Sequence, residues 1–157
     1  MAERNHVRSA ASSGGFFSGL LGFACCDQLD RARVVLAKAL ELSPLGSPLG
    51  WSYITLIRFL DEDYEGSIIA AERAGDAFRY VPGFNVASLA LLGRLSEAHA
   101  EARRFLQLIH GSWFGDAPPR DETIVLWLLE FLPIRSKIAR ERLRQGFALA
   151  GFPIARQ

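Results

Sequence analysis

The chain has 157 residues, of which half are apolar and 22% are charged, and its formal net charge is +1. A chain of this length and apolar content folds as one domain with a real core, which excludes a disordered chain. The near-zero net charge gives no reason to expect nucleic acid or an anionic membrane as a partner. No apolar run reaches the roughly 18 residues that a bilayer-spanning helix needs, so no membrane association is expected either.

The N-terminal residues divide into two parts. Residues 1–13 are polar and rich in serine and alanine, which predicts a disordered tail. Residues 14–26 are apolar and predict a first helix, although their glycines weaken it. The order of basic residues, Arg4 and Arg8, followed by this apolar stretch also resembles a signal peptide. Glu3, an acidic residue in the basic part, argues against that interpretation.

Two adjacent cysteines end the apolar stretch. Cys25 and Cys26 are neighbours in sequence, and such neighbours rarely pair, so we expect reduced thiols buried among apolar side chains. Reduced thiols, together with the lack of a long apolar run, favour a cytoplasmic location.

The rest of the chain predicts helices at regular intervals. Apolar residues recur at helical spacing, interrupted by glycine, proline and acidic residues, and no segment shows the alternation of a half-buried strand. The expected helices cover residues 30–42, 51–60, 64–77, 84–92, 95–109, 123–132 and 136–150, and the expected turns and loops include residues 45–50, 61–63, 81–83 and 111–120. The fold class is therefore all-α.

A motif of small and apolar residues recurs three times within these helices. The members of each copy are spaced four and then three apart, which places them on one helix face that a neighbouring helix can approach closely. The copies are Ala32–Leu36–Ala39, Ser67–Ala71–Ala74 and Ala98–Ala102–Phe105, and an apolar residue placed to plug the hairpin (Leu29, Tyr64 or Leu95) stands three positions before each. Counted from position 32 to 67 and from 67 to 98, the copies start 35 and 31 residues apart, a period typical of stacked helical hairpins.

These residues resemble the tetratricopeptide repeat, a helix–turn–helix unit of about 34 residues. The first copy matches the small and apolar positions that characterise the family's second helix, and Pro44 matches the proline that follows them. The third copy departs from this pattern, with Phe105 at the last small position and His110 at the proline position. The resemblance implies a right-handed superhelical solenoid of about three hairpins over residues 14–110. A C-terminal helical cap would follow over residues 111–157.

A narrower resemblance supports a regulatory setting. Runs such as ALELSP at residues 39–44 and ERLRQGFALAGFP at residues 141–153 are similar to the C-terminal repeat region of bacterial regulatory proteins. In those proteins the repeats follow a class III adenylate/guanylate cyclase domain or a winged-helix DNA-binding domain. Nothing in this chain resembles the catalytic or DNA-binding half, so the resemblance implies the interaction module without its effector.

The resemblance also implies a binding surface. In tetratricopeptide arrays the first helices line a concave face that holds the partner. Counted back from Ala32 and Ser67, the ligand-facing positions carry over to Phe17, Leu21, Leu49, Ser52, Leu56 and Phe59. These residues lack the lysine and asparagine with which some family members grip a terminal carboxylate. The apolar groove expected here suits an amphipathic helix or an apolar extended peptide, unless the chain's own tail or a second copy covers it.

No set of residues predicts catalysis, a cofactor or a metal site. His6, His99 and His110 are far apart, and none has a cysteine or carboxylate at metal-ligand spacing; His99 is expected to face solvent. The acidic turn at residues 61–63 lacks the pattern of a calcium loop, and a solvated turn before a helix explains its charges. The basic run at residues 135–144 is either a docking face for an acidic partner or the charged outer face of a cap.

The sequence as a whole favours a non-catalytic protein–protein interaction module that binds a protein or peptide partner through the apolar groove. Two alternatives stay open. In one, the chain is the regulatory half of a class III nucleotide cyclase and acts with a separate catalytic chain. In the other, it is a structural homodimer joined through the helix expected at residues 123–132, which is apolar nearly all round.

Overall fold

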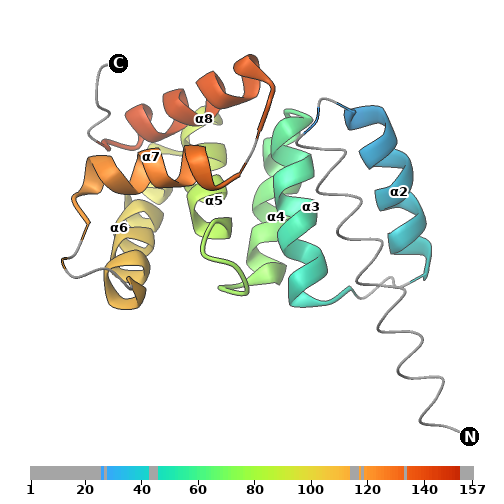
Figure 1. The fold of residues 1–157 in the computed structure, drawn as a ribbon, viewed down its shortest axis with the longest axis horizontal. Coiled ribbons are helices and arrows are strands. Elements are labelled where there is room, and N and C mark those ends of the chain that lie inside the picture. Colours follow the sequence, from blue (N-terminus) through green and yellow to red (C-terminus); the bar gives the residue numbers. More distant parts are fainter. Residues whose placement is uncertain are drawn as a thin grey trace, which may run out of the picture.

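The computed structural model describes residues 26, 28–42, 46–113, 117, 119–132 and 134–152, and these form helices and connections without any strand. The helices are α2 (Leu29–Leu42), α3 (Pro48–Leu60), α4 (Tyr64–Ala74), α5 (Val81–Leu91), α6 (Leu95–Ser112), α7 (Asp121–Phe131) and α8 (Lys137–Leu149) (Figure 1). The all-α prediction is confirmed for this part of the chain. The predicted tail at residues 1–13, nearly all of the apolar stretch at residues 14–26, and Cys25 lie outside it. Cys26 is free and exposed, so the expectation of a buried thiol was wrong for this residue.

Two helices begin three residues earlier than predicted, and each has a proline in its first turn. The loop expected over residues 45–50 ends early, because the Ser47 hydroxyl accepts a hydrogen bond from a first-turn N–H at 3.0 Å and Pro48 occupies the first turn of α3. Helix α5 begins at Val81, where the sequence predicts a break. Pro82 stands in the first turn of that helix, and proline removes no helical hydrogen bond there.

The repeated small residues lie inside helix interfaces. The three copies fall on α2, α4 and α6, and these helices begin at Leu29, Tyr64 and Leu95. Eight of the nine motif residues are buried, and the ninth, Ala39, is half-buried. The predicted packing role of the motif is therefore confirmed. Leu95, however, is 41% exposed and does not plug its turn.

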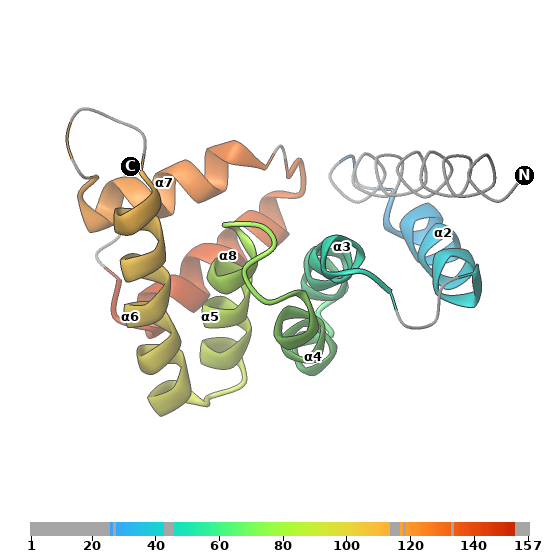
Figure 2. The same ribbon diagram turned by 90° about the horizontal axis from the view of Figure 1, so that it is seen from below.

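Helices that follow one another in sequence lie side by side. Helix α3 packs against α4, α4 against α5, and α5 against α6, while α7 and α8 run across their axes and α8 covers one side of α5 (Figures 1 and 2). One apolar core contains a fully buried side chain from each of α3, α5, α6, α7 and α8, namely Leu56, Phe84, Phe105, Leu128 and Phe147. A smaller cluster joins α2 to α3. The C-terminal helices thus share the core of the helices before them.

Two glycines allow α5 to lie close to the C-terminal helices. A Cβ atom on Gly146 of α8 would stand 2.7 Å from the Cα atom of Ala87, and a Cβ atom on Gly83 would stand 2.6 Å from Cδ2 of Leu128. Both distances are shorter than van der Waals contact. A side chain at position 146 would meet the α5 backbone and push the helices apart, whereas one at position 83 would displace the end of the Leu128 side chain. The sides of α5 that carry Gly83 and Ala87 are consequently covered by α7 and α8.

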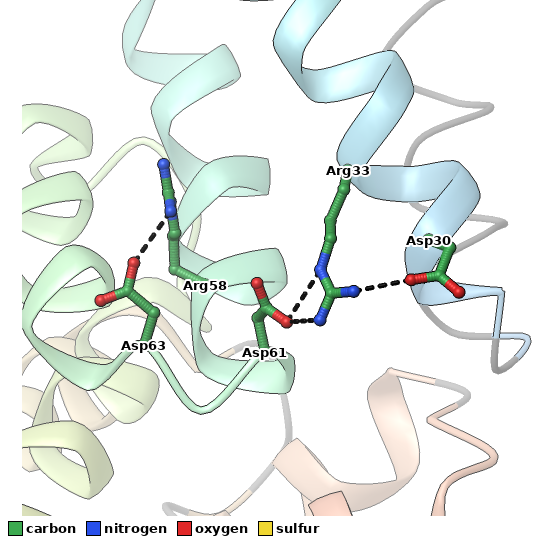
Figure 3. Close-up of polar contacts among 5 residues, drawn as sticks. All are labelled: Asp30, Arg33, Arg58, Asp61 and Asp63. Atoms are coloured by element: carbon green, nitrogen blue, oxygen red, sulfur yellow. Dashed lines mark hydrogen bonds and ion pairs between the residues drawn. The ribbon is translucent and has the colours of Figure 1, made fainter.

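The acidic turn between α3 and α4 is held by arginines. Asp61 accepts a hydrogen bond from Nε of Arg33 on α2 at 2.9 Å, and Arg33 also pairs with Asp30 at 2.6 Å (Figure 3). Asp63 accepts a hydrogen bond from Nη1 of Arg58 at 2.9 Å (Figure 3). Two of the three carboxylates in the turn, those of Asp61 and Asp63, are thus paired with an arginine of a neighbouring helix turn.

The same turn also contacts the C-terminal helix. Glu62 has φ of +61°, a backbone conformation that costs a residue with a side chain roughly 1 kcal/mol. Its carboxylate lies 3.0 Å from Nη2 of Arg142 on α8, and Nη1 of Arg142 donates to the hydroxyl of Tyr64 at 3.3 Å. The turn is therefore linked to α2 on one side and to α8 on the other.

Two fully buried serines differ in their hydrogen bonding, and this difference predicts opposite effects of one substitution. The hydroxyl of Ser67 donates to the Thr55 carbonyl at 3.0 Å, whereas the hydroxyl of Ser88 has no partner among the described residues. We expect Ser88→Ala to raise the free energy of unfolding, because it removes an unpaired buried hydroxyl, and Ser67→Ala to lower it, because it removes a hydrogen bond. The two variants should differ by about 1 kcal/mol. Urea denaturation of both variants measures this difference, and equal effects would contradict the assignment.

Candidate functional site

The structure places the six residues of the expected concave groove in three different settings. Ser52, Leu56 and Phe59 are at most 2% exposed, and the Phe59 ring packs edge-on against Phe84 of α5 with 5.0 Å between the ring centroids. Leu49, in the first turn of α3, is 42% exposed. The two remaining residues of the expected groove, Phe17 and Leu21, lie outside the described residues. The expectation of an open groove at Ser52, Leu56 and Phe59 is therefore corrected, because the helices packed against α3 bury these side chains.

The other candidate groups of the sequence form no reactive cluster in the described residues. His99 is exposed, as predicted, and His110 lies 3.4 Å from Asp121 at the surface. In the basic run, Arg142 pairs with the α3–α4 turn, while Arg135 is exposed. Among the described residues, no group of three histidine, cysteine or acidic side chains could hold a metal ion.

A groove with a volume of about 540 Å³ opens between α4, α5 and α6. Figure 2 shows α5 between the other two helices. The apolar floor of the groove is fixed by the core, since the floor residues Ile68, Ala71, Val81 and Leu89 are at most 5% exposed. Pro82, Asn85 and Leu89 share one face of α5, and this face points away from Ala87, which contacts α8. The groove thus uses the side of α5 that the C-terminal helices leave open.

The rim of the groove is charged, and its two arginines are held by carboxylates. Arg94 donates two hydrogen bonds to Glu97, at 2.8 and 2.6 Å. Arg104 donates two to Glu101, at 2.9 and 2.7 Å, and a third to Asp76, in the turn after α4, at 2.7 Å. Such forked pairs orient both partners more firmly than single contacts do. The rim therefore has a defined arrangement of charge on the α4 and α6 sides.

These contacts also favour the charged forms of three rim side chains. The hydrogen bond with Glu97 raises the pKa of Arg94, and the same bond lowers the pKa of the Glu97 carboxyl. The hydrogen bond with Glu101 raises the pKa of Arg104, and Asp76 adds to this effect. The ion pairs therefore favour the charged forms of Arg94, Glu97 and Arg104.

Comparisons with family models, curated proteins and solved structures find no match. The geometry of the groove therefore carries the functional argument. Among the described helices, none is both long enough and apolar enough to cross a membrane.

Sequence reasoning missed this groove, although a signal was present. The charged residues of α6 recur at spacings of three, four and three, which places Arg94, Glu97, Glu101 and Arg104 on one face. Glu72 in the last turn of α4 and Asp76 in the turn that follows this helix form a matching acidic pair. A charged face of a helix is ordinarily solvated, and only the neighbouring apolar floor of α5 turns these two faces into the walls of a groove.

Proposed function

We propose that this chain is a non-catalytic protein-interaction module, a helical-repeat scaffold of the tetratricopeptide type in a bacterial regulatory system. In this proposal the groove between α4, α5 and α6 holds a segment of the partner protein. The observation that carries the proposal is the combination of a rigid apolar floor with an ordered charged rim in a space of about 540 Å³. An apolar centre within a polar rim is the usual composition of a protein–protein contact.

The dimensions of the groove suit a peptide segment. Arg94 and Arg104 mark the two ends of its α6 wall, and ten residues of helix correspond to about 15 Å. An extended segment of four or five residues spans about the same length, as does a helix of roughly ten residues. Binding in either form would bury apolar side chains on the floor and leave polar groups at the rim.

The lining supports binding rather than catalysis. The described residues that line the groove include no serine, cysteine, histidine, lysine or tyrosine, so the usual nucleophiles and the histidine base are not among them. Three of its four carboxylates, those of Asp76, Glu97 and Glu101, already accept hydrogen bonds from an arginine. These groups provide shape and charge for recognition.

Filling the groove tests this proposal. Ala100 lines the groove and is exposed, so Ala100→Trp would obstruct the groove without disturbing the core. Ala148 of α8 is also exposed but lies outside the groove, which makes Ala148→Trp the matched control. In affinity capture from the source cells, we expect partner proteins to be retained by the wild type and by Ala148→Trp and to be lost from Ala100→Trp. Identical capture by all three folded proteins would contradict the proposal.

The two alternatives stay predictions. A role as the regulatory half of a class III nucleotide cyclase is compatible with the same groove, since it also requires a docked protein partner. The exposed apolar surface of α7 favours a homodimer. The buried side chains of α7 lie on one face of the helix, and Phe131, which stacks on Trp127, is 55% exposed. A second copy would have to cover that ring.

A further inference from the structure

We infer that the segment held in the α4–α5–α6 groove is cationic, with one or two lysine or arginine side chains beside an apolar anchor. This inference rests on the proposed function and adds the chemistry of the partner to it.

The formal charge of the groove is negative. Four carboxylates line it, those of Glu72, Asp76, Glu97 and Glu101, against the two guanidinium groups of Arg94 and Arg104, which leaves a charge of −2. Glu65, which lies 3.5 Å from Arg94, adds a further negative charge beside it. Glu72 is exposed and makes no ion pair with any described residue. The charge of Glu72 acts on Arg94 from a distance, but no described arginine contacts its carboxylate, which is therefore open to a ligand beside the apolar floor.

The two arginines do not make the groove an anion site. Three of the five N–H donors of Arg94 already go to Glu97 and Glu65, and three of those of Arg104 go to Glu101 and Asp76. A carboxylate or phosphate would therefore find only the remaining donors and would lie beside the carboxylates that hold each arginine. An incoming anion would also approach the free carboxylate of Glu72, and like charges repel. A cation meets neither obstacle. The charge pattern thus selects for a positive segment and against a negative one.

The floor adds an unused hydrogen-bond acceptor. Oδ1 of Asn85, which lines the groove on α5, is buried and has no hydrogen-bond partner among the described residues. Buried polar atoms are normally paired, because leaving one without a partner costs about 1–3 kcal/mol. The oxygen itself is covered, so a lysine ammonium or a peptide N–H on the floor would donate to it after the Asn85 side chain turns toward the groove. Both groups belong to the cationic segment inferred here.

Selection from a peptide library tests the inference. The full chain would be immobilised, and a displayed library of random peptides of roughly ten to twelve residues would be panned against it, since this length spans the groove as a helix. We expect the enriched peptides to carry more lysine and arginine than aspartate and glutamate, next to an apolar residue. Binding of a selected peptide should weaken roughly threefold in Glu72→Gln and roughly tenfold in Glu72→Lys, as expected for pairs at a protein surface. Glu130→Lys, an exposed change on α7, is the matched control and should leave binding unchanged.

The outcomes separate the inference from the proposed function. Enriched peptides that are acidic or uncharged, yet lose binding in Ala100→Trp, would overturn the inference and leave the interaction module standing. Cationic peptides whose affinity falls equally in Glu72→Lys and Glu130→Lys would also overturn it, because the attraction would then come from the net charge of the whole protein. If no enriched peptide is blocked by Ala100→Trp, both the inference and the groove as a binding site fail.

Discussion

Replacing Gly146 with valine is expected to lower the free energy of unfolding by about 3 kcal/mol, at the upper end of the usual cost of overpacking. A Cβ atom at this position would stand 2.7 Å from Cα and 2.9 Å from the carbonyl oxygen of Ala87. Both are backbone atoms of α5, so no side chain can rotate to relieve the clash. Helix α8 would have to move away from α5 and leave part of the shared core unfilled. Urea denaturation followed by far-UV circular dichroism measures the loss.

Gly111 provides the matched control for this substitution. It also lies in a helix, near the end of α6, but a Cβ atom there would meet nothing within 4 Å. Gly111→Val should therefore change stability by no more than about 0.5 kcal/mol, since valine and glycine differ little in helix propensity. Equal losses in the two variants would contradict the close α5–α8 contact and would attribute both effects to the backbone alone.

Replacing Phe59 with alanine is expected to cost about 3–5 kcal/mol, the range measured for large aromatic residues deleted from a core. The ring is 2% exposed and packs against Phe84 at 5.0 Å and Tyr64 at 5.5 Å between centroids. Its removal would leave a cavity between α3, α4 and α5. The expected result is a large decrease in the midpoint of urea denaturation.

Leu49 is the informative comparison, because the sequence assigns it and Phe59 to the same binding surface. Leu49 is 42% exposed, so Leu49→Ala should cost only about 0.5 kcal/mol, as for other surface changes. The concave-groove interpretation treats both residues as partner contacts and predicts small effects on stability for both. A small cost for Phe59→Ala would therefore restore that interpretation, whereas a large one would confirm that this residue belongs to the core.

The fold was predictable from the sequence in its elements and its packing motif. The spacing of Ala98, Ala102 and Phe105 identified the buried face of α6, and these residues are at most 5% exposed. The errors arose where a local signal had two meanings. Proline both interrupts helices and begins them, and Pro82 was interpreted as an interruption although it stands in the first turn of α5.

The site was less predictable, because exposure depends on contacts between helices far apart in sequence. The composition of α3 alone cannot show that α5 covers Leu56 and Phe59. For the same reason, the charged faces of α4 and α6 gave no indication that they flank an apolar floor. A face of one helix becomes a binding surface only through its neighbours, and the sequence specifies these neighbours only through packing.

The position of α8 has a consequence for how the protein unfolds. In a linear array each repeat touches only the next, so the ends can melt while the centre persists. Here α8 returns to α5, and Arg142 reaches the turn before α4, about eighty residues earlier in the chain. The C-terminal segment therefore closes α5, α6, α7 and α8 into a loop of contacts. Melting of the C-terminal end must break links to the middle of the chain, which favours a cooperative transition of this part over gradual fraying.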